Sequence, residues 1–179
     1  MKTKAESLYS LQLSHLPSFA HYLLEQKLDD IVQLQQEIGE QLQIPVLKAL
    51  KNLTAEEMYA LALTSTKELL EALASNKGKE YIQQSVQQWV SNTLPVIDKH
   101  QVIAEDLSLV IHTRKKAFLH FLPAYCSDME QMLQIIEELD IFLTRYNVAL
   151  TDAYVNTLQG KIAEHTHFIE KINSTSPSA

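Results

Sequence analysis

The feature that most constrains the fold of this chain is a long stretch without helix breakers near its C-terminus. Residues 127–173 contain no proline, and their one glycine is Gly160. Apolar residues recur there three and four positions apart, as on one face of an α-helix: Met132, Ile136, Leu139, Leu143, Tyr146 and Leu150. At ~1.5 Å per residue a single helix would measure about 70 Å, which exceeds the diameter of a domain of this size. We therefore predict that its second half projects from the folded body or packs against a partner chain.

The apolar seam changes phase in the second half of this stretch. From Leu150 the apolar positions follow at intervals of four, through Tyr154 and Leu158 to Ile162. Such a change resembles a stutter, which rotates the contact face of a coiled coil. We predict that the helix serves both the core of a bundle and a dimer and output seam, formed by Leu139, Leu143, Tyr146, Leu150, Leu158, Ile162, His165, Ile169 and Ile172. The alternative is two consecutive helices that are broken near Gly160.

The rest of the sequence also favours helices. The 179 residues include only three glycines and five prolines, and no segment alternates as a strand would. We predict an all-α fold, a single helical bundle formed by residues 1–173, with a long C-terminal helix over about 128–173 and a polar tail at 174–179. Shorter helical segments are expected at about 5–13, 17–42, 46–53, 54–74, 79–93 and 102–121.

Local signals set several of these boundaries. Thr54 and Glu57 have the spacing of a capping box, in which hydroxyl and carboxylate oxygens accept hydrogen bonds from the free N–H groups at a helix start. Ser127 and Glu130 have the same spacing at the start of the long helix. Gly78 is expected to take the left-handed position that ends the helix before it.

The charge balance argues against two classes of partner. Lys and Arg number 15 against 22 acidic residues, a net charge of −7, which disfavours nonspecific nucleic-acid binding and anionic membrane surfaces. No run approaches the ~20 apolar residues of a membrane span, and the N-terminus lacks the apolar core of an export signal. Cys126 is the single cysteine, so an internal disulfide is excluded. We predict a cytoplasmic protein without nucleic-acid binding or membrane insertion.

Residues that support catalysis or bind metals do not converge in the sequence. Glu164 and His167 form the Glu-x-x-His unit that di-iron bundles use twice, but it occurs once here, so no metal site is predicted. Neither a glycine-rich nucleotide loop nor a Gly-x-Ser-x-Gly elbow occurs. The adjacent carboxylates Asp29–Asp30 and Glu137–Glu138 are interpreted as solvated helix faces. The chain is therefore not predicted to be an enzyme.

One segment combines histidines with aromatic residues. His112, Lys116 and His120 recur at intervals of four. Two interpretations stay open for these histidines: hydrogen bonding at the edge of the core, or lining a pocket for a ligand such as haem. The candidate pocket residues are Trp89, His112, Arg114, Phe118, His120 and Tyr125.

The sequence resembles a family of bacterial sensors over roughly residues 80–177. The segments that carry the resemblance are 114–125 (RKKAFLHFLPAY), 139–146 (LDIFLTRY) and 168–177 (FIEKINSTSP). They resemble the N-terminal sensory domains of Rsb-type stressosome co-antagonists and the regions ahead of PAS domains in sensor histidine kinases. The resemblance implies a globin-like helical module without haem that dimerises and passes a conformational change along its C-terminal helix.

The same resemblance implies that residues 174–179 link the module to a following PAS domain. Haem-bearing globin-coupled sensors are relatives of these sensory domains. His112-Thr-Arg114 is similar to a step in them where arginine follows histidine by two residues. The spacing from this step to Pro123 and Tyr125 departs from their pattern, which puts haem ligation in doubt.

These observations give one main hypothesis and two alternatives. The main hypothesis is an N-terminal sensory and dimerisation domain of a cytoplasmic bacterial signalling protein, a PAS-containing sensor histidine kinase, that relays a population shift through its C-terminal helix. Its partners would be a second copy and a downstream signalling domain in the same chain, and it would need no cofactor. The alternatives are a haem-binding gas sensor that uses His112 or His120, and a helical protein-binding adaptor.

Overall fold

The computed structural model describes residues 13–44, 53–94 and 104–175, with the side chains of the last helix described as far as Gly160. Apart from their final residues, the helical segments predicted at 5–13 and 46–53 lie outside these ranges. Every regular element in the described part is a helix, which confirms the all-α fold.

The elements follow the predicted order with shifted boundaries. They are α2 (Leu16–Gln26), α3 (Leu28–Leu42), α5 (Ala55–Ala74), α6 (Gly78–Gln88), the π-helical turn η1 (Trp89–Thr93), α7 (Ala104–His120), α8 (Leu122–Tyr125) and α9 (Met129–Thr175).

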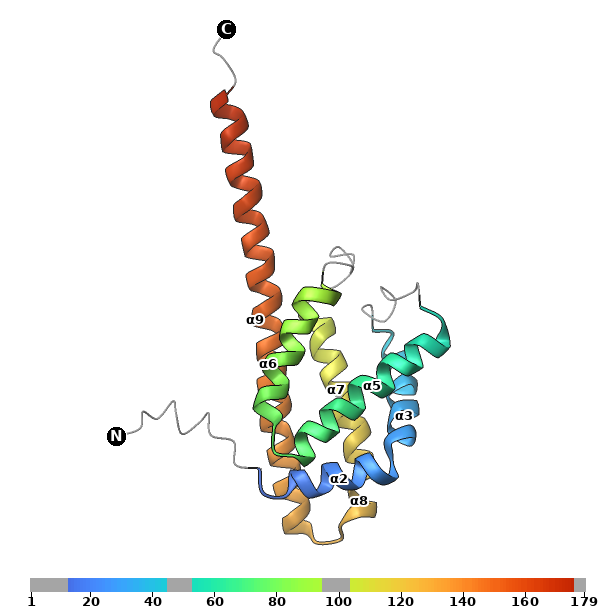
Figure 1. The fold of residues 1–179 in the computed structure, drawn as a ribbon. Coiled ribbons are helices and arrows are strands. Elements are labelled where there is room, and N and C mark those ends of the chain that lie inside the picture. Colours follow the sequence, from blue (N-terminus) through green and yellow to red (C-terminus); the bar gives the residue numbers. More distant parts are fainter. Residues whose placement is uncertain (1–12, 45–52, 95–103, 176–179) are drawn as a thin grey trace, which may run out of the picture.

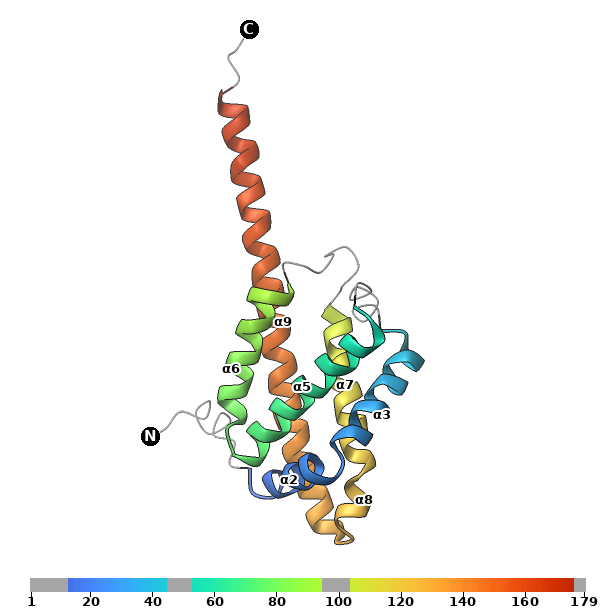
Figure 2. The same ribbon diagram turned by 45° about the vertical axis from the view of Figure 1, so that its right-hand side comes forward.

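The helices pack in two layers. α9, α7 and α3 lie side by side, α6 and α5 cover them, and α2 crosses one end beneath α5 (Figures 1 and 2). Apolar side chains from both layers meet in one core, whose fully buried members include Phe19, Ile31, Leu69, Leu70, Leu73, Phe118, Ile135, Leu139 and Phe142. Each such side chain contributes about 1.5–3 kcal/mol of transfer free energy.

The helix predicted over residues 17–42 is two helices. Lys27 separates α2 from α3 with φ −133° and ψ 6°, outside the helical region. The break lets α2 pack on α5 and α9 while α3 turns to pack on α7 and α5. Lys27 also pairs with Asp30 across 3.1 Å, and Asp29 accepts a hydrogen bond from the Tyr59 hydroxyl at 3.0 Å. These two carboxylates are exposed, but both have partners.

The two ends of α5 confirm one signal and correct another. The capping box at α5 is present: the Thr54 N–H donates to Glu57 at 2.7 Å and the Glu57 N–H donates to the Thr54 hydroxyl at 3.2 Å. The left-handed residue after α5 is Asn76, with φ 60°, so the prediction for Gly78 is wrong. Gly78 instead begins α6, where an added Cβ would lie 2.9 Å from the Phe142 ring. The glycine is needed for close packing of α6 on α9.

Carboxylates cap two further helices. Asp128, one residue after the predicted Ser127, caps α9, because its Oδ1 accepts from the N–H groups of Glu130 at 2.8 Å and Gln131 at 3.0 Å. Glu138 of α9 caps α2 from a distance in sequence: its carboxylate accepts from the N–H groups of residues 14–16, at distances from 2.8 to 3.3 Å. The interpretation of Glu138 as a solvated residue is therefore wrong. An anion at a helix start satisfies its free donors and complements its dipole.

α9 is a single helix of 47 residues that passes through Gly160 without a break. Its first part is packed in the body, and its second part extends well past the ends of α6 and α7 (Figures 1 and 2). The structure thus confirms one continuous C-terminal helix, about 70 Å long at ~1.5 Å per residue.

Candidate functional site

One face of α9 belongs to the core of its own chain. Leu139, Leu143, Tyr146 and Leu150, the first four residues of the predicted dimer seam, are buried beneath α6, α7 and α2. They are not available to a partner, so in this half the seam serves intramolecular packing. Leu158 is half-buried against the same core. The remaining predicted seam residues lie beyond the last described side chain: Ile162, His165, Ile169 and Ile172.

The opposite face of α9 carries a row of exposed β-branched residues. Ile141, Val148 and Val155 are 40%, 52% and 38% exposed and follow each other at intervals of seven. We call these three residues the heptad row. Val148 lies about 160° around the helix from Tyr146, which faces the core, at 3.6 residues per turn. α9 therefore has two apolar faces, of which the core of the chain covers one.

The end of the body on α9 is marked by an aromatic contact. Trp89 of η1 lies edge-on to Tyr154 of α9, with ring centroids 6.2 Å apart. η1 is a π-helical turn, in which the Leu94 N–H donates to the Trp89 carbonyl at 2.9 Å. Such turns are rare and often occur at functional positions. Beyond this contact α9 extends away from the body (Figure 1).

A buried polar network joins α9 to three other helices. The Tyr146 hydroxyl of α9 lies 2.6 Å from the Ser85 hydroxyl of α6, and the Tyr146 ring meets Tyr81 of α6 edge-on at 5.7 Å. Arg114 of α7 lies beside both phenols and donates to the Ser65 hydroxyl of α5 at 3.1 Å. The network thus links α5, α6 and α7 to the core face of α9.

Burial and the neighbouring groups act on the pKa values of Tyr81 and Arg114 in opposite directions. Burial raises the pKa of the Tyr81 phenol, and the nearby guanidinium offsets this only in part. Burial alone would lower the pKa of Arg114, but the phenols of Tyr81 and Tyr146 raise it, and the net direction is upward. Arg114 is thus charged and the phenol of Tyr81 protonated at neutral pH. The ion pairs between described side chains do not include Arg114, so hydroxyl groups replace the counter-ion that such a cation normally needs.

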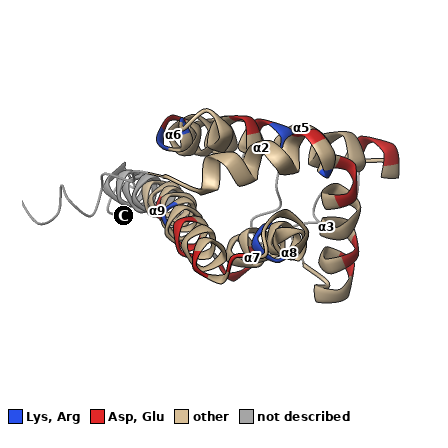
Figure 3. Ribbon diagram, turned by 90° about the horizontal axis from the view of Figure 1, so that it is seen from below, with Lys and Arg blue, Asp and Glu red and all other residues tan. Residues whose placement is uncertain are grey.

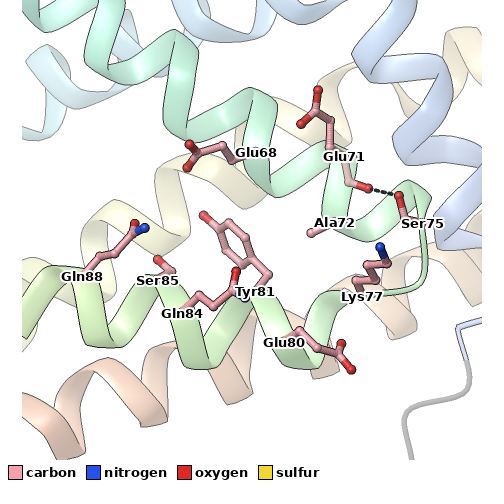
Figure 4. Close-up of a pocket in the computed structure, with 10 residues that line it drawn as sticks. All are labelled: Glu68, Glu71, Ala72, Ser75, Lys77, Glu80, Tyr81, Gln84, Ser85 and Gln88. Atoms are coloured by element: carbon pink, nitrogen blue, oxygen red, sulfur yellow. Dashed lines mark hydrogen bonds between the residues drawn. The ribbon is translucent and has the colours of Figure 1, made fainter.

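A cleft of about 680 Å³ opens between α5 and α6, next to this network. Tyr81 reaches into its middle from α6, and Glu68 approaches from α5 on the other side (Figure 4). Its lining combines three carboxylates, one ammonium group and several neutral polar groups: Glu68, Glu71, Glu80, Lys77, Ser75, Ala72, Tyr81, Gln84, Ser85 and Gln88. The lining suits a polar ligand that carries positive charge. It contains no nucleophile paired with a general base of the kind that covalent catalysis needs.

The predicted pocket residues do not form one site. Phe118 is buried in the core, and Tyr125 packs against Phe19 and Tyr22 beneath α2. His112 and His120 are both exposed on α7. None of the six predicted residues lines the cleft; Arg114 comes nearest to it, through Tyr81, and Trp89 lies at the exit of α9.

The cleft and the heptad row were both missed in the sequence. The lining of the cleft comes from two helices, and no motif joins Glu68 to Tyr81 or Ser85. A signal did exist for the heptad row, since a strict interval of seven between β-branched residues is typical of a coiled-coil seam. The stronger three–four spacing on the other face of the same helix obscured it.

The described part of the chain lacks two other kinds of site. No three His, Cys, Asp or Glu side chains of the described residues lie close enough to hold a metal ion. No helix among the described residues is long and apolar enough to cross a membrane.

Acidic residues gather on α3 and on the neighbouring end of α5, at the side of the layer opposite α9 (Figure 3).

Comparison with known proteins returned no match to any family model, curated protein or solved structure.

Proposed function

We propose that this chain is the sensory and dimerisation module of a bacterial signalling protein, and that α9 carries its output. The observation that carries this proposal is the division of α9: the helix is packed in the body as far as Leu158 and continues beyond it without a break. A rigid helix that is held by a core at one end transmits a shift or a rotation to whatever it contacts at the other. The resemblance noted above supports a PAS-containing sensor histidine kinase as the parent protein.

The cleft between α5 and α6 is the input site that we propose. Two of its lining residues contact the same side chain of α9, that of Tyr146. Tyr81 packs on the Tyr146 ring, and Ser85 shares a hydrogen bond with the Tyr146 hydroxyl. A ligand that displaces Tyr81 therefore changes the packing and the hydrogen bonding of α9 directly. The acidic lining favours a small polar molecule that carries an amine or another cationic group.

The mechanism we propose is a population shift between two arrangements of the body. A hydrogen-bonded network in a packed interior has discrete alternatives rather than a continuum, since each buried group must find a partner in every arrangement. The ligand would favour one alternative through its differential affinity, and α9 would move with Tyr146. Trp89 reports such motion, because it is the single tryptophan and packs on Tyr154 where α9 leaves the body.

Insertions in the projecting part of α9 test the relay. The full chain would be fused after Ala179 to the catalytic half of a dimeric histidine kinase, and one, three or seven residues would be inserted after Gly160. One residue rotates the helix by about 100°, whereas seven restore its phase to within about 20°. We expect autophosphorylation to change several-fold with one or three residues and to return with seven.

The same measurement separates the relay from a helical adaptor. An adaptor uses α9 as a surface or a tether, so the kinase activity would be indifferent to the phase of the insertion. Equal autophosphorylation at all insertion lengths would overturn the proposed function. No observation favours the haem sensor, since both candidate histidines, His112 and His120, are exposed outside the described cleft.

A further inference from the structure

We propose that the heptad row of α9 is a docking surface for a second copy of this chain, with the two helices parallel and in register. The inference rests on the proposed function and names the partner that its output helix engages. It differs from the dimer seam predicted from the sequence, because the first half of that seam is buried within the protomer. The two apolar faces of α9 then have separate roles, one in the core and one between copies.

The first argument is the period of the row. Ile141, Val148 and Val155 keep a strict interval of seven, and the sequence continues it with Ile162 and Ile169. On a straight helix a row of this period drifts by about 20° per heptad, and two helices that wind around each other keep it on one face. The core face keeps the same interval only from Met132 to Leu150, whereas the heptad row continues past the part of α9 that is packed in the body. In a coiled coil the positions three residues after each member also face the partner. Here they are Thr144, Thr151, Leu158, His165 and Ile172.

The second argument is length. The repeat from residue 141 to residue 172 spans more than four heptads, or about 48 Å at ~1.5 Å per residue. Sustained repeats of about three to four heptads are typical of coiled coils. The helix that carries the row is continuous over this whole range, and beyond the body only another element of similar length can cover it. A second copy supplies such an element with the same repeat.

The third argument concerns direction. Each member of the heptad row is Ile or Val, and in parallel coiled coils such residues favour two strands where the position three residues later is Leu, as it is at Leu158. In a parallel pair, the residue just before a member of the heptad row lies next to a residue of the other copy. That residue is four positions after the same row member. Asp140 would therefore face Arg145 of the second copy, a pair of opposite charge, although Asp140 already contacts Lys115 at 2.6 Å.

The surroundings of the row are compatible with pairing. Because Val148 points away from the core face of α9, a helix that packs on it does not displace the buried residues of that face. The acidic side chains on α3 lie at the opposite side of the layer (Figure 3), and their repulsion is screened beyond about 10 Å at 0.1 M salt. Parallel pairing also brings both projecting ends to the same side, where one following domain could engage both.

Disulfide crosslinking of the full chain tests contact and direction together. In a Cys126→Ser background, Ile141→Cys and Val148→Cys would each be oxidised in solution, with the exposed Asn156→Cys as the matched control. In a parallel, in-register pair, equal positions of the row face each other, so the first two variants form covalent dimers and the control does not. In an antiparallel pair centred on the repeat, residue 148 would lie opposite residue 165, and neither row variant would crosslink to itself, which would contradict the parallel arrangement.

Sedimentation equilibrium supplies the second measurement. Val148→Glu introduces two facing charges into the proposed seam, and we expect it to weaken dimerisation at least about tenfold. Leu61→Glu makes a similar change at an apolar residue that is 50% exposed on α5, and we expect it to leave the dimer unchanged. Circular dichroism would verify that both variants keep the helical content of the original chain.

The outcomes are decisive in either direction. Crosslinking at 141 and 148 but not 156, with selective weakening by Val148→Glu, supports the seam. A monomeric original chain at high micromolar concentration, as expected if a different protein covers the row, would overturn it, and so would a dimer that Val148→Glu leaves intact. These results are independent of the insertion experiment. A confirmed seam together with kinase activity that does not depend on the phase of the insertion would contradict the proposed relay but leave the seam intact.

Discussion

The two apolar faces of α9 contain similar residues in opposite surroundings. On the core face Phe142 and Tyr146 are 2% and 5% exposed, whereas Val148 on the other face is 52% exposed. From Met132 to Leu150 the core face alternates intervals of four and three, so it also repeats every seven residues, and after Leu150 it advances by fours to Tyr154 and Leu158. The exposed face keeps the interval of seven from Ile141 to Val155, and the sequence continues it to Ile169. A heptad interval alone therefore does not distinguish the two faces. On the core face it ends at Leu150, whereas the exposed face keeps it past Leu158, where a long helical partner could pack.

The largest expected effect comes from truncating one residue on each face. Phe142→Ala should lower the free energy of unfolding by about 3–5 kcal/mol, because it leaves a cavity in the core. Val148→Ala should change it by no more than about 0.5 kcal/mol, as for an exposed position. Urea denaturation monitored by circular dichroism, at a concentration where monomers dominate, measures both. Equal losses for the two variants would contradict the assignment of the faces.

Two adjacent glutamates on α9 give the next comparison. Glu138→Ala should destabilise the protein by about 2 kcal/mol, since three backbone N–H groups at the start of α2 lose a charged acceptor. Glu137→Ala removes an exposed carboxylate and should have an effect within about 0.5 kcal/mol. Thermal or urea unfolding of both variants tests this, and hydrogen exchange in α2 should rise only for Glu138→Ala. Unchanged exchange there would show that the cap is dispensable.

The two glycines Gly78 and Gly160 contrast the packed and the projecting part of the structure. At Gly78 a methyl group would meet the buried Phe142 ring at 2.9 Å, so Gly78→Ala should destabilise the protein by about 1 kcal/mol, after a ~1 kcal/mol gain in helix propensity is set against overpacking. At Gly160 no atom lies within 4 Å, so Gly160→Ala should raise the helicity of α9 without loss of stability. Circular dichroism at 222 nm and unfolding midpoints distinguish the two.

The smallest expected effect concerns Glu57 in the capping box of α5, which lies outside both faces of α9. Hydrogen bonds from the Thr54 N–H and hydroxyl lower the pKa of Glu57 below the ordinary glutamate value. A carboxyl with a lowered pKa in the folded state stabilises the protein above its unfolded pKa, and this stabilisation is lost as the pH falls through the folded pKa. The stability difference between the original chain and Glu57→Gln should be constant above about pH 6 and shrink below ~4.3. Urea titrations at several pH values measure it, and a pH-independent difference would contradict the capping role.

The sequence predicted the helices well where a boundary is a local matter. The Thr54–Glu57 box was located correctly, because both partners belong to the same turn. The start of α9 was misplaced by one residue, since Ser127 and Asp128 are both competent caps and only the backbone path selects Asp128. The break at Lys27 could not be predicted. No proline or glycine lies at the break. It arises because α2 packs on α9 while α3 packs on α7, and both contact α5.

The candidate site was less predictable than the fold. Arg114 was identified, but its partners Ser65, Tyr81 and Tyr146 come from three other helices, at sequence distances that no pattern connects. His112 and His120 were weighed as pocket residues because they neighbour aromatic residues in sequence. On a helix, however, neighbours in sequence point to different sides, and both histidines are exposed.

By itself, the sequence determined that this chain is all-helical and favoured one long helix near the C-terminus, because helix propensity, capping signals and the absence of prolines are local properties. The continuity of that helix through Gly160 is a finding of the structure. Only the tertiary structure decided which face of that helix the body covers. Both faces carry apolar residues, so periodicity alone identifies two candidate stripes and cannot rank them. The choice depends on where α6, α7 and α2 lie, which is set by contacts such as those of Gly78 with Phe142 and of Glu138 with the start of α2.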